Sequence, residues 1–378
     1  MYGTALLDWL ACAAGGRGEP AARAASGLGD GVSDCVAALG AAGHVLDFDD
    51  THGPSLAHLS APTAPAALVL GASLGATIGD VLDAYAAGFE VMGEVAAVNH
   101  PAIRARGWHP TAVCGVVGAA VSAAGLLGLD RDRTEHAVRL ALLRAGGLHA
   151  AFGSDGKAVQ VGMSAASGVD VARIAAAGAT AGPEVFGGFE EAFGARWPAD
   201  ALEAGAGRAA IRENWIKAYP CCLQAHGAIE VAALVREDRG VPDRTIVVAV
   251  HPVSLQTAWR TTVANGLEAK FSIPYLTAFT LLNGPPAVES FREVDPAAQD
   301  LAAERVVVRT DPVLLESEAV IEADGERLAR VEAALGSPAR PMDERGLAAK
   351  VTALAGDRLD GILDDPARPA AEVLEALR

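Results

Sequence analysis

The amino-acid sequence predicts a mainly helical protein with an α+β second domain. Apolar, alanine-rich segments punctuated by glycine follow one another up to about residue 210, with few strand signals among them. Short β-branched runs appear only after Trp215. A chain of 378 residues, of which 51% are hydrophobic, is long enough to bury the core of more than one domain.

We expect the helical domain to span residues 1–212, with residues 335–378 returning to it after a proline-rich linker. Its helices are expected to begin at polar N-caps such as Asp80 and Thr134. The expected helices cover residues 3–15, 33–46, 62–75, 79–98, 110–126, 133–151, 161–180, 343–356 and 368–378.

The second, smaller domain is expected at residues 213–334. An Asp324-Gly325 turn between two β-branched arms predicts a hairpin. The expected strands cover residues 245–252, 304–310, 318–323 and 327–333, and the expected helices cover 222–237 and 267–282.

Composition and charge exclude several classes of protein. Thirty Lys and Arg against 47 Asp and Glu give a net charge of −17, which argues against nucleic acid or an anionic membrane as a partner. The two long uncharged stretches, 59–79 and 110–129, lack the residues and aromatic belts of membrane spans, so we expect buried helices. Five cysteines without a CxxC pair and an N-terminus without a basic segment favour a cytoplasmic protein with no structural zinc.

The first candidate site is an acidic, histidine-rich segment between residues 44 and 58. If a helix continued through it, Asp47 would share a face with Asp50 and Thr51. The pattern leaves three interpretations open: a solvated acidic helix end, an acid–base site or a metal site. The candidate side chains are those of Asp47, Asp49, Asp50, His52 and His58.

A second candidate is His109, at the expected start of a helix. It follows Arg104, Arg106 and Trp108, a setting in which an imidazole can carry a proton beside a bound anion. The alternative is that His109 only caps the helix while the arginines face water.

A third candidate is Lys157, which ends the loop Gly153-Ser-Asp-Gly-Lys157 before an expected helix. It could reach an anion held by backbone N–H groups, or it could be a surface lysine. The spacing does not match a phosphate-binding P-loop.

Two further motifs fall in the second domain. Lys217-Ala-Tyr-Pro-Cys-Cys222 is followed by His226, which could touch Cys222 if a helix has begun there. We do not expect Cys222 to be a nucleophile, because the motif supplies no third orienting group. Tyr275, at an expected helix start, is either a proton donor or a packed core residue.

Nucleotide-binding, zinc-protease and serine-hydrolase motifs are missing from the sequence. Histidines, lysines and a tyrosine scattered over two domains suit an enzyme that binds carboxylates with cations and transfers one proton. The residues therefore favour a cofactor-free lyase or isomerase.

Taken in order, these motifs resemble the MmgE/PrpD family, which includes dehydratases, decarboxylases and epimerases of small carboxylates. The resemblance extends from about residue 3 to Pro341. It implies a helical domain built from both chain ends, an α+β lid with the site between them, a homodimer, and no metal or organic cofactor. The family's site residues would fall on Asp47, Thr51, His58, His109, Lys157, Lys217, Cys222 and Tyr275.

The sequence departs from the family at several positions. Gln160 stands where the family usually has a histidine, Cys222 where decarboxylases have one, and Glu94 where an arginine is common. The chain is also expected to lack an N-terminal helix and part of the lid. These departures leave the substrate open.

We therefore expect a lyase that removes water or carbon dioxide from a small carboxylate. His58 and His109 are expected to carry protons, Lys157 and Lys217 to bind carboxylates, and Tyr275 to donate a proton. Asp47, Thr51, Cys222, Arg104 and Arg106 are the expected substrate-binding residues. The alternatives are an epimerase that uses the same residues and a non-catalytic homologue.

His52 is expected to matter less than His109. It precedes Gly53-Pro54 at the start of a loop, where exposure and mobility are expected.

Overall fold

The computed structural model describes residues 1–203 and 210–377. The chain divides into two compact units. The first is helical and comprises Met1–Ala151, Asp155–Ile216 and Asp343–Arg378. The second contains a four-stranded sheet and comprises Phe152–Ser154 and Lys217–Met342. The predicted fold class, mainly helical with an α+β second part, is confirmed.

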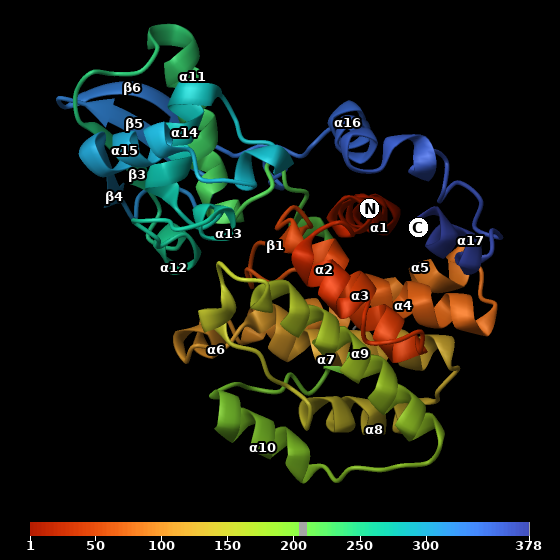
Figure 1. The fold of residues 1–378 in the computed structure, drawn as a ribbon. Coiled ribbons are helices and arrows are strands. Elements are labelled where there is room, and N and C mark those ends of the chain that lie inside the picture. The colour runs from red at the N-terminus through yellow and green to blue at the C-terminus, as the bar shows by residue number, and fades with distance from the viewer. Residues whose placement is uncertain (204–209, 378) are drawn as a thin grey trace. The chain divides into compact units, whose positions relative to one another are not determined.

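The first unit is built around long apolar helices from the N-terminal half of the chain (Figure 1). Two short strands, β1 (Thr51–His52) and β2 (Asn214–Trp215), pair antiparallel within it. Its helices are α1 (Tyr2–Gly16), α2 (Pro20–Ala25), α3 (Val32–Val45), α4 (Ser60–Leu74), α5 (Ile78–Val98), α6 (Ala102–Ala105), α7 (Pro110–Leu126), α8 (Arg131–Leu142), α9 (Gly156–Ala176), α10 (Glu184–Phe193), α16 (Glu344–Ala355) and α17 (Ala370–Ala376).

Small residues let the central helices of this unit approach closely. A Cβ atom on Gly162 of α9 would lie 2.2 Å from the carbonyl oxygen of Ala37 in α3. One on Gly168 would lie 2.7 Å from the carbonyl oxygen of Val116 in α7. Helix α9 is thereby packed against both α3 and α7, and its first turn is held beside the ends of these two helices that carry His44 and His109.

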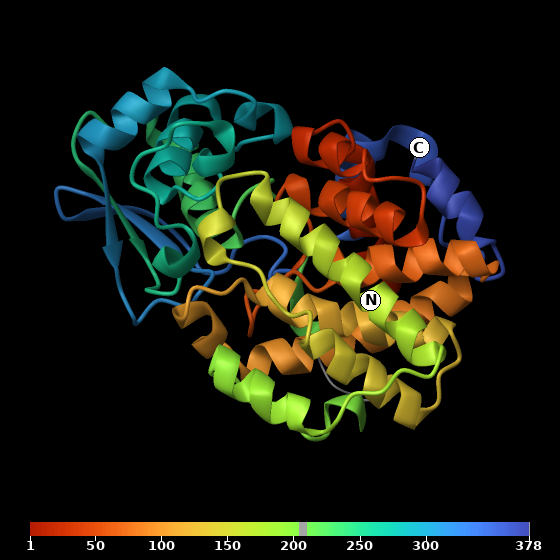
Figure 2. The same ribbon diagram turned by 60° about the horizontal axis from the view of Figure 1, so that its bottom comes forward.

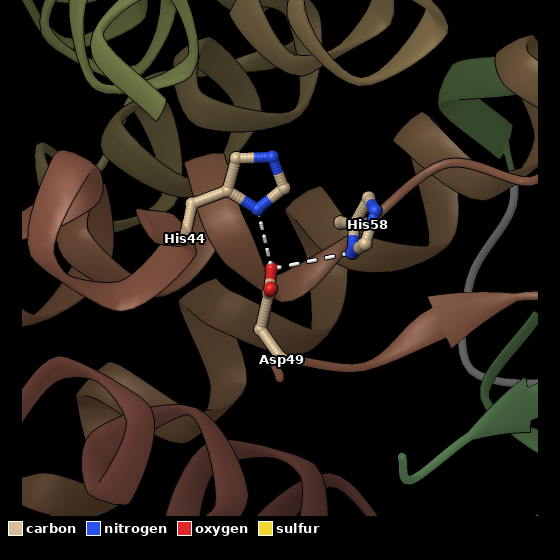
Figure 3. A group of neighbouring side chains, drawn as sticks. All are labelled: His44, Asp49 and His58. Atoms are coloured by element: carbon tan, nitrogen blue, oxygen red, sulfur yellow. Dashed lines mark hydrogen bonds and ion pairs between the residues drawn. The ribbon is translucent and has the colours of Figure 1, made fainter. Parts of the chain in front are cut away.

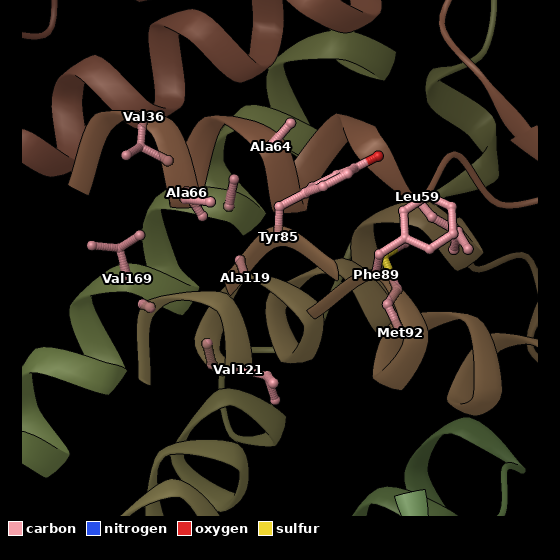
Figure 4. Close-up of a cluster of buried hydrophobic side chains, with 14 of the residues drawn as sticks. Val36, Leu59, Ala64, Ala66, Tyr85, Phe89, Met92, Ala119, Val121 and Val169 are labelled. Atoms are coloured by element: carbon pink, nitrogen blue, oxygen red, sulfur yellow. The ribbon is translucent and has the colours of Figure 1, made fainter. Parts of the chain in front are cut away.

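Around these contacts lies a continuous apolar core. Its larger members include Tyr85 and Phe89 of α5, which pack among alanine and valine side chains of neighbouring helices (Figure 4). Alanine and valine supply little area each, so the core gains stability from the number of buried side chains rather than from aromatic bulk.

The C-terminal helices α16 and α17 belong to the first unit. The ammonium of Lys350 in α16 lies 2.6 Å from the carboxylate of Asp8 in α1, and both side chains are buried. At the start of α17, the backbone N–H of Ala370 donates to the carbonyl oxygen of Ala76.

In the second unit, the strand order is β4-β3-β5-β6, with β3 parallel to β4 and antiparallel to β5. Helices α11, α14 and α15 pack against this sheet (Figures 1 and 2). The strands are β3 (Ile246–Val250), β4 (Val306–Thr310), β5 (Ala319–Ala323) and β6 (Glu326–Val331); the helices are α11 (His226–Arg239), α12 (Ser254–Thr257), α13 (Gly266–Ala269), α14 (Ile273–Asn283) and α15 (Pro296–Arg305).

Several expectations about single elements were wrong. Helix α8 ends at Leu142, because Gly146 and Gly147 follow and Gly147 has a φ of +115°. The N-cap of α5 is Thr77, whose hydroxyl accepts from the Asp80 backbone N–H, so Asp80 is the third residue of a capping box. The N-cap of α8 is Asp130 rather than Thr134. Helices α2, α6, α10, α12 and α15 were not predicted.

The two uncharged stretches are buried helices, as expected: α4 lies in the first and α7 in the second. Among the described residues, no helix combines the length and the hydropathy that a membrane span requires.

Candidate active site

The acidic, histidine-rich segment forms a buried loop between α3 and α4. Helix α3 ends at Val45, and Asp47 has a φ of +53°, which breaks the helix. The expected helical face shared by Asp47, Asp50 and Thr51 is therefore wrong. The solvated interpretation is wrong as well, because all five candidate side chains of the segment are buried, those of Asp49 and Asp50 completely.

Asp49 lies between two imidazoles (Figure 3). Its Oδ2 atom is 2.8 Å from Nδ1 of His44, in the last turn of α3, and 3.4 Å from Nδ1 of His58, just before α4. The two rings meet edge to face, with centroids 4.6 Å apart. One carboxylate oxygen thus links the end of one helix to the start of the next.

Lys157, in the first turn of α9, extends this cluster. Its Nζ atom lies 2.8 Å from Nε2 of His44 and 2.9 Å from Oδ1 of Asp47, which in turn is 3.8 Å from Nε2 of His58. A lysine ammonium only donates, so Nε2 of His44 accepts and its Nδ1–H donates to Asp49. The lysine is 5% exposed, so the surface interpretation of Lys157 is wrong.

The electrostatics of the cluster follow from this arrangement. Burial alone would raise the pKa of Asp49, but attraction to His44 and His58 and their hydrogen bonds hold it well below its ordinary value. Burial lowers the pKa of His44, and the Lys157 charge lowers it further. Asp49 is therefore an anion near neutral pH, and His44 is a neutral donor to it.

The residues His44, Asp49 and His58 also have the chemistry and spacing of metal ligands, since one ligand atom of each lies within 4.8 Å of the others. A cation bound there would have to replace the proton on Nδ1 of His44. It would also sit beside the Lys157 ammonium, which is 2.8 Å from the other nitrogen of that ring. The donor set therefore fits a hydrogen-bonded relay better than a metal site.

His109 stands next to this cluster, at the N-cap of α7. Its ring is stacked on that of His44, with centroids 6.1 Å apart and planes inclined by 23°. Its Nδ1 atom lies 2.8 Å from the amide nitrogen of Gln160 in α9. Burial first, and then the Lys157 charge, lower the pKa of His109 well below its ordinary value.

The rest of the loop makes a separate network. Asp50 accepts hydrogen bonds from Ser60 and Asn214, and burial raises its pKa to about 7. Nδ1 of His52 lies 2.9 Å from the hydroxyl of Ser55. His52 is 2% exposed and burial lowers its pKa to about 4, so the expectation that it is exposed was wrong.

Thr51 is buried in β1, where it pairs with Trp215 of β2. Within the described part of the chain, its hydroxyl has no hydrogen-bond partner. It lies on the same loop as Asp47 and Asp49. Its hydroxyl can therefore still donate a hydrogen bond to a bound molecule or accept one from it.

The two candidate arginines have different surroundings. Arg104 donates from Nη2 to Nε2 of His149, at 2.8 Å. Arg106 is exposed, and its guanidinium lies against Gly194 at the end of α10. Arg104 is thereby held beside the segment that packs on His109, whereas Arg106 is directed to a different helix.

Three candidate residues belong to the second unit. Lys217 is 1% exposed. The backbone N–H of Cys222 donates to the carbonyl oxygen of Lys270, and Cys222 precedes α11, which begins at His226. The Tyr275 hydroxyl accepts from the backbone N–H of Asp295, and burial raises its pKa. Their roles toward a substrate stay predictions.

Sequence reasoning missed three residues of the cluster as functional groups. Asp49 was a candidate side chain of the motif but was given no role, His44 was in the motif without being a candidate, and Gln160 was noted only as a departure. A signal for His44 was present, since a histidine in the last helical turn can meet a carboxylate in the loop that follows. The pairing of Gln160 with His109 spans 51 residues, which local spacing cannot predict.

Buried imidazoles joined to carboxylates and a lysine are the groups of an enzyme that works by acid–base chemistry. The chain matches the MmgE/PrpD N-terminal domain over residues 31–195 and the MmgE/PrpD C-terminal domain over residues 219–375. It belongs to the MmgE/PrpD family, as the resemblance of its motifs implied.

Its curated relatives include cis-aconitate decarboxylases. The chain is 27% identical to that of Mus musculus over 270 residues and 28% identical to that of Homo sapiens over 275 residues. Each alignment covers 67% of this chain, and the chain spans only 55% and 56% of these relatives. A cis-aconitate decarboxylase-like protein of Aspergillus oryzae is 32% identical over 251 residues, which are 58% of this chain and 50% of that protein.

Proposed function

We propose that this chain is a cofactor-independent lyase that removes carbon dioxide or water from a small polycarboxylate. The observation that carries the proposal is the buried cluster of His44, Asp49, His58 and Lys157, next to His109. The relatives named cis-aconitate decarboxylase support the choice of a lyase and of a carboxylate substrate.

The reaction class defines what the site must supply. When carbon dioxide leaves, the electron pair of the broken C–C bond stays on the substrate and spreads toward a neighbouring carboxylate. Cations and hydrogen-bond donors stabilise that charge, and a proton then forms the new C–H bond. Loss of water needs a base at the carbon and an acid at the hydroxyl instead.

His58 is the proposed proton carrier. Its two nitrogens lie 3.4 Å from Asp49 and 3.8 Å from Asp47, so its charged form would be stabilised from both sides. Lys157 is the proposed cation for a substrate carboxylate, with Asp47 orienting its ammonium. In the proposal, Arg104 and Thr51 contribute further contacts to the substrate.

From the second unit, Lys217, Cys222 and Tyr275 are proposed to complete substrate binding, with Tyr275 as a further proton donor. Arg106 lies against Gly194. It can bind the substrate, as proposed, only if its guanidinium moves away from that glycine.

The test is proton NMR in heavy water with cis-aconitate, 2-methylcitrate and iminodisuccinate as separate substrates. The proposal predicts consumption of one of these acids with formation of a new unsaturated product. Deuterium uptake without net reaction would identify an epimerase instead. No change in any of the three acids would contradict the proposed lyase.

A further inference from the structure

The side-chain amide of Gln160 is held in one orientation by a single backbone residue. Its Oε1 accepts from the N–H of Leu148 at 2.9 Å, and its Nε2 donates to the carbonyl oxygen of Leu148 at 3.2 Å. An exchange of the two ends would set donor against donor and acceptor against acceptor. The end of the amide that faces His109 is therefore the NH₂ group.

This orientation decides where His109 carries its proton. Nε2 of Gln160 lies 2.8 Å from Nδ1 of His109, so Nδ1 accepts a hydrogen bond. A neutral imidazole has one accepting and one protonated nitrogen, so its proton is on Nε2. A proton added at Nδ1 would face an N–H group and lose this hydrogen bond.

The same short segment also holds the backbone of His109. The N–H of His109 donates to the carbonyl oxygen of Gly147, and the N–H of His149 donates to that of Gly107. The N–H of Leu148 is then available to Gln160, and its carbonyl oxygen accepts from Gln160 as well as from the backbone N–H of Ala151. A Cβ atom on Gly147 would lie 2.6 Å from Cβ of Ala112 and 3.3 Å from Oε1 of Gln160, so this close approach requires glycine.

The charged groups around His109 act in the same direction. Burial and the surrounding cationic or ionisable nitrogen groups favour its neutral form. The neighbouring carboxylates Asp47 and Asp49 are hydrogen-bonded to Lys157 and His44, respectively. The nitrogen groups are those of Lys157, His44, His58 and His149, the last of which is bonded to Arg104.

We propose that Gln160 is a positioning residue that fixes His109 as a neutral imidazole with its proton on Nε2. His109 then serves as a hydrogen-bond donor to the negative charge that develops on the substrate, and not as a base. Proton transfer is left to His58. This assignment of roles rests on the proposed lyase function, whereas the protonation of the His109 ring does not.

A neutral imidazole suits this role. It can donate to an enolate-like oxygen without first losing or gaining a proton, and an oriented donor in a dry site needs little reorganisation. The inference therefore differs from the sequence-based expectation, in which His109 and His58 both carry protons.

The test is ¹⁵N NMR of the histidine rings, with the His109 signals assigned by their loss in His109→Asn. From about pH 5.5 to about pH 8, Nδ1 of His109 should give the signal of a non-protonated ring nitrogen and Nε2 that of a protonated one. A protonated Nδ1 in the unaltered protein would overturn the proposal.

Two variants distinguish the hydrogen bonding of the Gln160 amide from the packing of its side chain. Gln160→Glu places an acceptor at Nδ1, so that nitrogen should become protonated, and kcat should fall about 10²-fold. Gln160→Leu keeps comparable bulk without a donor, and both ring nitrogens should then share the proton, with a loss of about tenfold in kcat. A Gln160→Glu protein with unchanged ring signals and unchanged kcat would contradict the assignment.

The NMR result is independent of turnover. If Nδ1 is non-protonated but none of the acids reacts, the positioning role of Gln160 stands and the lyase proposal fails. If an acid reacts while Nδ1 is protonated, the lyase proposal stands and the positioning role of Gln160 fails.

Discussion

Asp49→Asn tests whether the hydrogen-bonded group of His44, Asp49 and His58 takes part in catalysis or is only a buried part of the loop. The substitution keeps the size of the side chain but removes the charge 3.4 Å from Nδ1 of His58. At an effective dielectric constant of about 20, that charge stabilises an imidazolium at His58 by roughly 5 kcal/mol. Part of this is retained, because an Asn oxygen in the place of Oδ2 would still face Nδ1 of His58 as well as that of His44. We expect kcat to fall about 10²- to 10⁴-fold.

Asp50→Asn is the matched control. Asp50 is the next residue, is equally buried, and bonds to Ser60 and Asn214 rather than to imidazoles. Its pKa of about 7 means that it is already partly protonated near neutral pH. We expect a loss of stability of about 1–3 kcal/mol from rearranged hydrogen bonds, and a kcat within about tenfold of the unaltered protein.

The assay is steady-state turnover of the acid that reacts fastest in heavy-water NMR, with the fold of each variant checked by circular dichroism. A folded Asp49→Asn protein with kcat within about threefold of the Asp50→Asn protein would refute the relay.

Four further predictions concern the two other histidines of the motifs, the dependence of stability on pH, a buried ion pair and the oligomeric state. His109→Ala removes an oriented hydrogen-bond donor and should lower kcat about 10²- to 10³-fold, whereas His52→Ala should lower it about tenfold or less; equal losses at the two positions would mean that His109 is not part of the site. The folded-state pKa values of His44, His52 and His109 are lowered, so their stabilising contribution is present above about pH 6.5 and is lost as the pH falls. The pKa values of His100 and His149 are lowered too, and only the raised pKa of Asp50 acts oppositely. The unfolded chain therefore binds more protons than the folded one, and the free energy of unfolding should fall by more than about 1 kcal/mol per pH unit below about pH 6, measurable by urea unfolding. Lys350→Met leaves a buried carboxylate without its ion pair and should cost about 3–5 kcal/mol in the same assay; an unchanged midpoint would contradict this. We propose that the protein is a homodimer, so light scattering should give roughly twice 38.4 kDa, and a monomer at micromolar concentration would exclude it.

The fold was predictable because its signals are local. Long alanine-rich segments gave the positions of α3, α5 and α7, and the β-branched runs gave all four strands of the sheet. Short helices such as α12 were not predicted, because four residues span barely one helical turn and cannot show a repeat of apolar positions.

The site was only partly predictable, for a physical reason. Local sequence suggested that Asp47, His58, His109 and Lys157 carry chemistry, and the structure places all four within one cluster. The contacts that set their charge and tautomer come from segments far apart in the chain. The bond of Lys157 to His44 spans 113 residues, and such a pairing depends on the close approach of α9 to α3.

The exposure of His52 was mistaken for a related reason. Gly53-Pro54 does mark a turn, but β1 pairs with β2, which lies more than 160 residues later, and this pairing buries the imidazole. A turn motif such as Gly-Pro predicts the local backbone conformation. It does not predict which segments from later in the chain pack over that turn.

The most direct test of the central claim is turnover in heavy water by the unaltered protein and by His58→Gln. Our account predicts that the unaltered protein converts one of the carboxylates into a new unsaturated product. If that product forms by loss of carbon dioxide, it should carry one deuterium at the carbon that receives the proton. His58→Gln, folded by circular dichroism, should convert the same acid at least about 10²-fold more slowly. A His58→Gln protein that forms the product within about threefold of the unaltered rate would contradict the assignment of His58 as the proton carrier.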